Sequence, residues 1–408
     1  MTVPRVLLLT GTPPGYPQSA GVFLQDLCLS YPRDKIFCFA VILPIALPFM
    51  EDLKWLPTAY TVRPRQRGIA QFGANIDNMS GFLLRRYAKL IHEPSLVNRI
   101  VQFGKQHNIE MVWAVLNAPI LINITGRVAT GLGARLVNTI WDPPEFRSKE
   151  LSFSRFEHNS FMREFANVLL MSERCGVASE AMAEEYKKRY GVESVVLIHG
   201  VHPNLMKPAA KELSSDSQFT IGFIGAWYAK NEWLALLSAL SSVNWRIEGR
   251  NVIVRVLSTD LSVRGYDGIH IEYLGWRSVE ETVDLLSQVD IAYLPYWFDE
   301  TYSLSVRLCF PNKLSTYLAA GRPVLFHGPE DSSVARFLRR FPAGLCCHSL
   351  ESTEIIDSLR KFIVDKEFYA SATHAGQAAR EQELNLRVFR QRFASLIGIG
   401  ENDLLPLT

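Results

Sequence analysis

Short runs of consecutive apolar residues recur along this chain, and each is followed by a loop and then by a segment with helical spacing. The first run, Val6–Leu9, precedes a glycine- and proline-rich loop at Gly11–Ala20 and a helical pattern over Gly21–Ser30. Similar runs follow at Met111–Val115, Leu136–Ile140 and Val168–Met171. Continuous apolar runs, rather than alternating ones, are typical of parallel strands that are covered on both faces. The pattern therefore predicts strands and helices in alternation around a parallel sheet.

A polar, proline-bearing stretch at His202–Gln218 interrupts this pattern, and a second series of strands begins after it. We predict the strands of this series at Phe219–Gly225, Val252–Leu257, His270–Leu274, Ile291–Pro295 and Val324–Phe326. A chain of 408 residues also exceeds what one hydrophobic core usually supports. The sequence therefore predicts an α/β protein with two doubly wound domains. We place these domains at residues 1–202 and 219–382, with a linker at 203–218 and a C-terminal segment at 383–408.

The charge of the chain is balanced, with 43 lysines and arginines against 41 acidic residues. No overall field therefore favours nucleic acid as a partner. The six cysteines include no C-x-x-C pair, and the run Cys346-Cys347-His348 lacks the spacing of a zinc site. We therefore expect neither a structural metal nor disulfides, which is typical of a reducing compartment such as the cytoplasm.

Apolar segments long enough to cross a membrane are not predicted. We expect Met1–Thr10 to be a strand rather than a signal peptide, because only one arginine precedes a short apolar run. The longest apolar run, Cys38–Met50, is short and is broken by two prolines. Basic residues lie among large apolar ones at Gly81–His92 and Arg336–Arg340. Each of these segments is either a membrane-surface helix or an amphipathic helix that faces its own domain, and the sequence leaves both interpretations open.

The most informative segment of the chain is a short helix that begins at Pro311. Proline at the first helical position costs no hydrogen bond, and Gly321 fits the left-handed cap that ends many helices. Such a helix leaves the backbone amides of Asn312, Lys313 and Leu314 without partners. A phosphate group would satisfy these amides, helped by the helix dipole and by the Lys313 ammonium.

The sequence PNKLSTYLAAGRPV, from Pro311 to Val324, closely resembles the donor-site helix of retaining GT-B glycosyltransferases of the large family 4 group. Further blocks resemble that family in the same order: SEAMAEEYKKRY at Ser179–Tyr190, FTIGFIG at Phe219–Gly225, YLGWR at Tyr273–Arg277 and VDIAYLP at Val289–Pro295. The resemblance implies two Rossmann-like domains that face each other across a cleft, the first for the acceptor and the second for a nucleotide-sugar donor. It also implies a last helix, here Asn385–Leu396, that crosses back to the first domain.

The resemblance further implies which residues hold the diphosphate of the donor. Lys313, with the amides at the start of its helix, is the first element; a buried helix with a surface lysine is the alternative. Lys230, in the loop that Gly225 opens, is the second, with a solvated lysine as its alternative. The glycine-rich loop that contains Gly15 and Gly21 is the third, although a plain turn explains these glycines equally well.

Contacts with the base and the ribose follow from the same resemblance. The loop of Gly275, Trp276 and Arg277 is expected to pass the base, where Trp276 is available for stacking unless it packs in the core. The family's two glutamates would fall on Leu308 and Thr316, so neither carboxylate is present. The Thr316 hydroxyl can give the ribose only a weaker, neutral hydrogen bond.

On the acceptor side, Trp141-Asp142-Pro143 falls where many relatives carry His-Glu-Pro or His-Asp. Asp142 is the remaining polar candidate for contact with the transferred sugar, and a helix or turn cap is its alternative role. No Asp-x-Asp triplet occurs in the chain. The resemblance therefore implies catalysis without a metal or a cofactor, in which Asp142, Lys230 and Lys313 act and the leaving diphosphate is stabilised by amides and lysine.

Taken with these residues, the resemblance implies a retaining glycosyltransferase that moves a sugar from a nucleotide diphosphate to a saccharide or lipid-linked saccharide. We expect it in the cytoplasm, or at the cytoplasmic face of a membrane that it contacts peripherally. The loss of both glutamates and of the histidine favours a competing interpretation, a binding module or pseudoenzyme of the same fold. A sugar-nucleotide epimerase or a phosphorylase is a second alternative, and the phosphorylase would usually need a pyridoxal-phosphate lysine in a longer chain. Turnover of any sugar nucleotide would distinguish an enzyme from a binding module.

Overall fold

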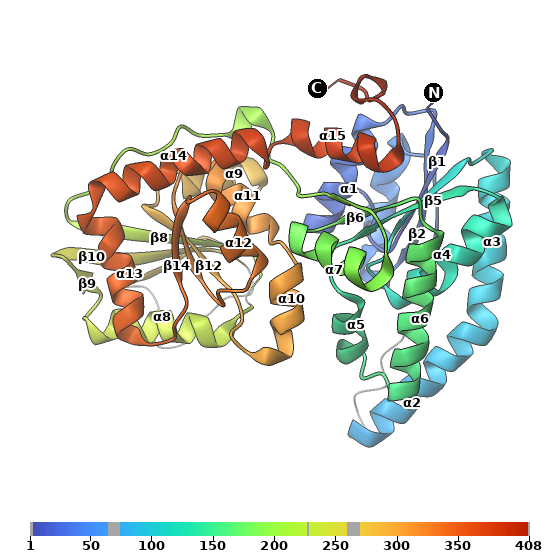
Figure 1. The fold of residues 1–408 in the computed structure, drawn as a ribbon, viewed down its shortest axis with the longest axis horizontal. Coiled ribbons are helices and arrows are strands. Elements are labelled where there is room, and N and C mark those ends of the chain that lie inside the picture. Colours follow the sequence, from blue (N-terminus) through green and yellow to red (C-terminus); the bar gives the residue numbers. More distant parts are fainter. Residues whose placement is uncertain (1–2, 64–73, 227, 259–269, 407–408) are drawn as a thin grey trace. The chain divides into compact units, whose positions relative to one another are not determined.

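The computed structural model describes residues 3–63, 74–226, 228–258 and 270–406, and the chain forms two compact units (Figure 1). Unit 1 comprises Met1–Leu197 and Arg390–Thr408, and unit 2 comprises Ile198–Phe389. The helix α15 (Leu386–Ile397) therefore begins in unit 2 and ends in unit 1, in agreement with the predicted crossover helix. Among the described helices, none combines the length and the apolar character that a bilayer crossing requires.

Unit 1 is built on a parallel sheet with the strand order β3-β2-β1-β4-β5-β6-β7. Its strands are β1 (Val6–Thr10), β2 (Ile36–Ile42), β3 (Thr58–Val62), β4 (Met111–Val115), β5 (Arg135–Ile140), β6 (Arg174–Val177) and β7 (Ser194–Val196). The residues of β1, β2 and β4 are all buried, which explains why their apolar runs are continuous. The chain leaves β1 toward β2 and returns to β4 on the other side of β1. The loops after β1 and β4 therefore meet at a topological switch point.

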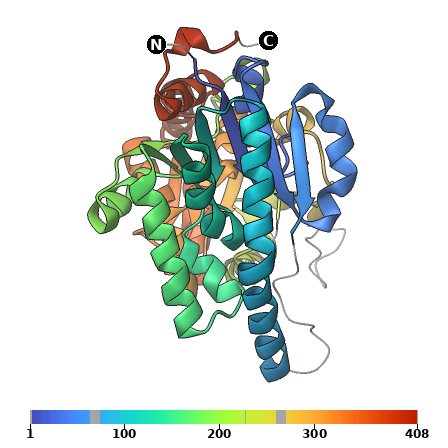
Figure 2. The same ribbon diagram turned by 90° about the vertical axis from the view of Figure 1, so that its right-hand side faces the viewer.

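The helices of unit 1 lie on both faces of this sheet (Figure 2). They are α1 (Ser19–Ser30), η1 (Pro44–Trp55), α2 (Ala74–Tyr87), η2 (Ala88–His92), α3 (Glu93–Gln106), α4 (Pro119–Leu132), α5 (Pro144–Glu150), α6 (Arg155–Met171), α7 (Glu180–Tyr190), the end of α15 and η5 (Glu401–Asp403). The helices α2 and α3 run on from each other through η2, a π-helical turn, and form one long helix along the side of unit 1 (Figure 2).

One predicted strand of unit 1 is wrong, because Val168–Met171 is the last turn of α6. A capping box between Ser154 and Glu157 starts this helix and favours helical conformation through the segment. Val168 and Leu169 are buried whereas the next two residues are exposed, which is the pattern of a helix with one inward face. The strand that we expected here is β6, which begins at Arg174.

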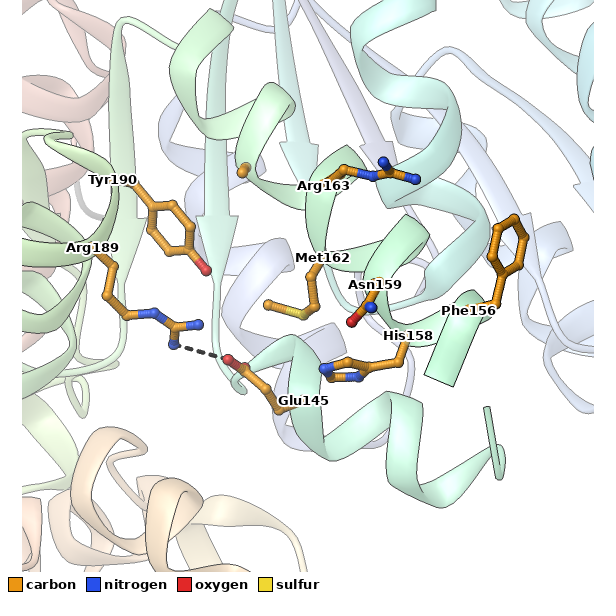
Figure 3. A pocket seen from close by; sticks show the side chains of 9 residues that line it. Glu145, Phe156, His158, Asn159, Met162, Arg163, Arg189 and Tyr190 are labelled. Carbon is orange, nitrogen blue, oxygen red and sulfur yellow. Dashed lines mark ion pairs between the residues drawn. The ribbon is translucent and has the colours of Figure 1, made fainter. Parts of the chain in front are cut away.

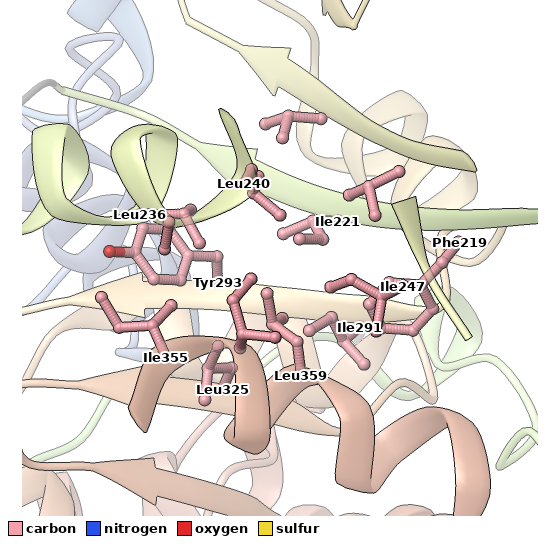
Figure 4. Close-up of a cluster of buried hydrophobic side chains, with 14 of the residues drawn as sticks. Phe219, Ile221, Leu236, Leu240, Ile247, Ile291, Tyr293, Leu325, Ile355 and Leu359 are labelled. Atoms are coloured by element: carbon pink, nitrogen blue, oxygen red, sulfur yellow. The ribbon is translucent and has the colours of Figure 1, made fainter. Parts of the chain in front are cut away.

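Unit 2 has a second sheet, with the strand order β11-β10-β8-β12-β13-β14, and a short antiparallel strand, β9, beside β10. Its strands are β8 (Gln218–Ile224), β9 (Arg246–Ile247), β10 (Arg250–Leu257), β11 (Ile271–Tyr273), β12 (Ile291–Pro295), β13 (Val324–His327) and β14 (Gly344–Cys347). All pairs on the main path are parallel. The core lies between this sheet and the helices α8 and α13, where Ile221, Leu236, Tyr293 and Leu359 are buried (Figure 4).

The helices of unit 2 connect these strands. They are η3 (Pro203–Leu205), α8 (Lys230–Ser242), α9 (Val279–Leu286), η4 (Glu300–Tyr302), α10 (Ser303–Leu308), α11 (Asn312–Ala319), α12 (Ser333–Arg340), α13 (Ser352–Val364), α14 (Lys366–Gln382) and the start of α15. The basic segment Arg336–Arg340 belongs to α12, and its Phe337 and Leu338 are buried. This segment is therefore an amphipathic helix that packs in its own unit.

Residues 203–218, which we expected as a linker, lie within unit 2 as a strap across its surface. The backbone amides of Lys207 and Ala210 donate to the carbonyls of Ala319 (2.8 Å) and Gly321 (3.0 Å). Further along, the buried Asp290 accepts hydrogen bonds from the amide and the hydroxyl of Ser214. The polar composition of this segment reflects these bonds to backbone and side-chain groups of unit 2.

Candidate functional site

The carboxyl ends of the parallel strands of unit 2 bring several loops to one edge of the sheet. The chain leaves β8 toward β10 on one side and returns to β12 on the other, so the switch point lies between β8 and β12. Ligands of open α/β sheets usually bind in the crevice at such a point. The loop after β8 begins at Gly225, the loop after β11 holds Gly275–Arg277, and the loop after β12 holds Tyr296–Phe298.

The predicted phosphate-binding helix is α11, which starts one residue later than expected. Pro311 is its N-cap rather than its first helical residue, and Gly321 has the left-handed φ of +72° that we predicted. The expected free amide of Leu314 is paired, because it donates to the Pro311 carbonyl at 3.1 Å. The amides of Asn312 and Lys313 have no acceptor among the described residues. Two donors, rather than three, remain for an anion.

Three predicted residues share the partly exposed face of α11. Asn312, Lys313 and Thr316 are half-buried, and Thr316 is the i+4 neighbour of Asn312 and the i+3 neighbour of Lys313 on the helix surface. Leu314 is fully buried, so its side chain supports the fold and does not reach solvent. Leu308, the other position without the family's glutamate, is also buried, on α10.

The ammonium of Lys313 lies against two aromatic rings and a carbonyl. Its Nζ atom is 4.3 Å from the centroid of the Phe223 ring and 4.0 Å from that of the Tyr228 ring. The same atom donates a hydrogen bond to the Ala226 carbonyl at 3.0 Å. Burial lowers the pKa of Lys313 well below its usual range, although the residue as a whole is half-buried. The aromatic rings and the carbonyl dipole favour the charged form.

The absence of a side chain at Gly225 leaves space for the Lys313 side chain. The φ angle of Gly225 is +77°, in the left-handed region that favours glycine. A Cβ atom at this position would lie 3.1 Å from Lys313 Cε. The predicted donor-site residues Gly225 and Lys313 are therefore brought together, with the glycine shaping the path of the lysine.

Tyr228 is a residue of this site that the sequence analysis missed. Its ring lies under Lys313 and 4.9 Å from the Trp297 ring, and its hydroxyl is buried with no hydrogen-bond partner among the described residues. Burial raises the pKa of this hydroxyl, so it is protonated at neutral pH. The following residue, Ala229, has a left-handed φ of +55° although it is not glycine. Such backbone strain is common at functional sites.

Behind this surface lies a buried polar network that was also missed. His327 is 1% exposed, its Nε2 atom lies 2.7 Å from the Ser349 carbonyl, and its Nδ1 atom lies 2.8 Å from the Tyr293 hydroxyl. Burial lowers the pKa of His327 to about 4, so the ring is neutral at neutral pH. Because a carbonyl only accepts, Nε2 donates to it, and Nδ1 accepts from the tyrosine.

Glu232 ties this network to the loop after β12. It is 2% exposed, and its Oε1 atom accepts a hydrogen bond from the Phe298 amide at 2.8 Å. The backbone carbonyl of Glu232 lies 3.1 Å from the Tyr293 hydroxyl, which shares its single proton between this carbonyl and His327 Nδ1. Glu232 is the one acidic residue of α8 and directly precedes the apolar run Trp233–Leu237, which is the sequence signal that could have indicated a buried role. These bonds hold the loops after β8 and β12 at the switch point.

The remaining predicted residues of unit 2 lie at the same edge of the sheet. Lys230 is exposed at the start of α8. Trp276 is 63% exposed, which excludes the core-packing alternative. Arg277 donates from Nη1 to the Trp276 carbonyl at 2.8 Å, and Gly275 has a φ of +70°. The loop is therefore a tight turn that presents the indole to solvent.

Two predicted residues belong to unit 1. A Cβ atom on Gly21 would lie 2.1 Å from the Tyr16 carbonyl oxygen, so the contact that requires this glycine is internal to its turn. Asp142 lies 3.9 Å from the Arg147 guanidinium, and its side chain is 45% exposed. The N-cap of α5 is Pro143, so Asp142 does not cap that helix.

Trp141, at the position of the family's histidine, packs edge-on against Phe23 at 5.2 Å. Its indole nitrogen is buried without a partner among the described residues. The tryptophan therefore fills space in unit 1 where relatives are expected to present an imidazole.

An open groove of about 710 Å³ lies on unit 1 between α5, α6 and α7 (Figure 3). It is lined by Glu145, Phe156, His158, Asn159, Met162, Arg163, Ala166, Arg189 and Tyr190. Its charges are partly satisfied internally, because Arg189 pairs with Glu145 at 2.8 Å. None of the residues that we predicted as site residues lines this groove.

Neither a protein-family model nor a curated protein sequence matches this chain. Solved structures do match it over almost its whole length. HepE from Anabaena, crystallised with UDP, aligns with 97% of this chain and 99% of its own, at a TM-score of 0.67 and 16% identity. Sucrose-phosphate synthase from Thermosynechococcus elongatus aligns with 96% of this chain and 98% of its own, at a TM-score of 0.65 and 10% identity.

A third similar structure is the UDP-forming α,α-trehalose-phosphate synthase from Burkholderia vietnamiensis. It aligns with 97% of this chain and 99% of its own, at a TM-score of 0.60 and 10% identity. The chain has the GT-B fold. This fold confirms the two doubly wound, parallel-sheet domains predicted from the sequence. Unit 1 corresponds to the N-terminal domain of the GT-B fold, and unit 2 to its C-terminal domain.

Proposed function

We propose that the protein is a glycosyltransferase that moves a sugar from a nucleotide diphosphate to a saccharide or lipid-linked saccharide. The observation that carries this proposal lies at the start of α11, beside the β8/β12 switch point. There the side-chain ammonium of Lys313 lies near two unpaired backbone amides, those of Asn312 and Lys313. Amides at a helix N-terminus and a nearby ammonium are suited to a diphosphate. The likeness to HepE, crystallised with UDP-glucose, supports the same ligand class.

In the proposed reaction, the bond between the anomeric carbon and the diphosphate oxygen breaks, and an acceptor hydroxyl forms a new bond to that carbon. The negative charge that develops on the diphosphate is stabilised by the α11 amides and Lys313, and Lys230 adds a second cation. The hydroxyl proton passes to the departing diphosphate, so the products are the glycosylated acceptor and the free nucleotide diphosphate. We propose retention of configuration and no metal, because the chain lacks an Asp-x-Asp triplet and resembles retaining enzymes around α11.

The remaining roles follow from the positions of the side chains. We propose that Gly275, Trp276 and Arg277 contact the base, that Thr316 contacts the ribose, and that unit 1 supplies Asp142 on the acceptor side. Trp276 is suited to stacking because its indole is exposed. We propose UDP as the nucleotide, since HepE was crystallised with UDP and the trehalose-phosphate synthase is described as UDP-forming. The proposed location is the cytoplasm.

The proposal is tested by the thermal stability of the protein with UDP-, GDP-, ADP- and TDP-linked sugars, followed by release of free nucleotide from the sugar that stabilises it. Stabilisation and release with the parent protein, and loss of both in Lys313→Ala, are the expected results. Stabilisation by no sugar nucleotide would contradict the proposal.

A binding module without transfer activity is the second candidate. It is favoured by the buried Leu308 and by Trp141, which occupy positions where the family carries a glutamate and a histidine. Binding of a sugar nucleotide without release of its nucleotide, with a broad set of saccharide acceptors present, would support this candidate instead.

A further inference from the structure

The long helix on the side of unit 1 exposes a row of large apolar side chains. Leu83, Tyr87, Leu90 and Ile91 are 60%, 58%, 67% and 59% exposed. They span the end of α2 and the π-helical turn η2, which together form one continuous helix with α3 (Figure 2). We call these four residues the α2 ridge. Single exposed apolar residues are ordinary, but a contiguous row marks an interaction surface.

The α2 ridge points away from the rest of unit 1. The same helix is held to α6 by Arg85, which bonds Glu157 at 2.8 Å, and by Lys89, which lies 3.4 Å from the Ser160 hydroxyl. Successive residues of a helix are about 100° apart, so positions 83, 87 and 90 lie roughly opposite positions 85 and 89. The helix therefore packs by one side and presents the ridge on the other.

The π-helical turn brings two of these side chains out together. Leu90 and Ile91 are neighbours in sequence, and both are more than half exposed. An extra residue in a helical turn shifts the register of the side chains that follow, and such turns are often found at functional sites. Here the shift widens the exposed apolar row just before α3 begins at Glu93.

The free charge around the ridge is positive. The segment Gly81–His92 contains three arginines or lysines and no acidic residue. Arg85 is neutralised by Glu157, and Lys89 lies on the side of the helix that packs against α6. The cation exposed beside the ridge is therefore Arg86. The next acidic residue, Glu93, is buried and pairs with Arg127 at 2.6 Å, so it does not offset the charge of Arg86 at the surface.

We infer that the α2 ridge, with Arg86, binds an anionic phospholipid surface. Large apolar side chains flanked by cations on one face of a helix are the combination that holds a helix in the boundary of a bilayer. Each lysine or arginine near an anionic leaflet adds attraction of its own. A second copy of the ridge would bring its own Arg86 close to the first, so the charge favours an anionic surface over self-association. This inference does not depend on transferase activity.

The test is co-sedimentation of the full chain with vesicles of phosphatidylcholine alone and of phosphatidylcholine mixed with phosphatidylglycerol. The expected result is binding to the anionic vesicles that weakens with salt. The double variant Leu90→Ser/Ile91→Ser should lower the vesicle partition coefficient at least tenfold, and Arg86→Gln about fivefold. Melting temperature and UDP affinity should stay at the parent values in both variants, because the replaced apolar and arginine side chains are exposed.

Leu170→Ser is the matched control, because Leu170 is 66% exposed on α6 of the same unit and lies outside the ridge. It should bind vesicles like the parent. Equal binding to neutral and anionic vesicles, no binding to either, or unchanged binding of the Leu90→Ser/Ile91→Ser variant would overturn the inference. So would a dimer in sedimentation velocity that this variant dissolves, since it would assign the ridge to a second copy of the chain.

Discussion

The Nζ atom of Lys313 lies 4.0 Å from the centroid of the Tyr228 ring and donates a hydrogen bond to the Ala226 carbonyl. The ammonium is thus held at the start of α11, close to the two unpaired amides. Since Lys313 already has partners within the protein, a diphosphate must compete with a ring contact and a carbonyl bond. The affinity that this lysine contributes is therefore the difference between its bonds to phosphate and these existing contacts.

Replacing Lys313 by alanine should weaken UDP binding by about 1.5–3 kcal/mol, the range for a hydrogen bond with a charged group. Isothermal titration calorimetry with UDP measures this loss. Lys361→Ala is the matched control, because Lys361 also lies over an aromatic ring of unit 2, Phe368 at 4.6 Å, but on α13. Equal UDP affinity of Lys313→Ala and the parent would show that Lys313 does not contact the nucleotide.

Replacing Tyr228 by phenylalanine tests the buried hydroxyl that has no partner among the described residues. Removing an unsatisfied buried hydroxyl should leave the melting temperature unchanged or raise it, because no hydrogen bond is lost. If the hydroxyl donates to a bound phosphate or sugar, UDP or UDP-sugar affinity should fall by about 1 kcal/mol. A variant that binds every ligand like the parent would show that the hydroxyl does not face the ligand.

Replacing Gly225 by alanine should cost stability and ligand affinity together. Alanine at a left-handed φ costs about 1–2 kcal/mol, and the added Cβ would press on Lys313. Gly249→Ala is the matched control, because Gly249 has a φ of +79° and a Cβ atom added there would meet nothing within 4 Å. Denaturant unfolding should show a similar loss for both variants, whereas UDP calorimetry should show a loss for Gly225→Ala alone. A normal UDP affinity in Gly225→Ala would contradict the link between the glycine and the lysine.

The buried His327 predicts a component of the pH dependence of stability. Its pKa falls from 6.5 to about 4 on folding, so the unfolded chain binds a proton that the folded chain does not bind between these values. The free energy of unfolding should therefore decrease as the pH falls from about 6.5 to about 4, by about 3 kcal/mol in total. At higher pH this contribution is fully present.

Urea unfolding at several pH values measures this component as the difference between the parent and His327→Gln. Glutamine can still accept from Tyr293 and donate to the Ser349 carbonyl, but it does not titrate. An identical pH dependence in parent and His327→Gln would show that His327 is not buried as a neutral ring.

Much of the fold could be predicted, because buried parallel strands are recognisable in a sequence as continuous apolar runs. The strand Met111–Val115 and the strand Ile291–Pro295 have the predicted bounds, since both are continuous apolar runs in the middle of a sheet. The same rule gave a wrong strand at Val168–Met171, because four apolar residues at the end of a helix resemble a short buried strand. The capping box at Ser154 was the signal that would have corrected it.

The site could be predicted only where proline and glycine residues fix the backbone conformation. Pro311 and Gly321 locate α11, but the hydrogen bond from the Leu314 amide to the Pro311 carbonyl depends on the conformation of the cap. Tyr228 and His327 could not be selected, because aromatic residues and histidines are common and only tertiary packing places these two beneath the loops of the switch point.

The return of the chain from unit 2 to unit 1 also has a consequence for biosynthesis. Phe393 of α15 packs against Trp113 at 4.7 Å, and the Leu405 amide donates to the Ser30 carbonyl at 2.7 Å. Domains generally fold in the order in which they leave the ribosome. Unit 1 is synthesised first, but it lacks part of its packing until residues 390–408 emerge. The apolar surface around Trp113 therefore stays exposed in the nascent chain while the whole of unit 2 is translated.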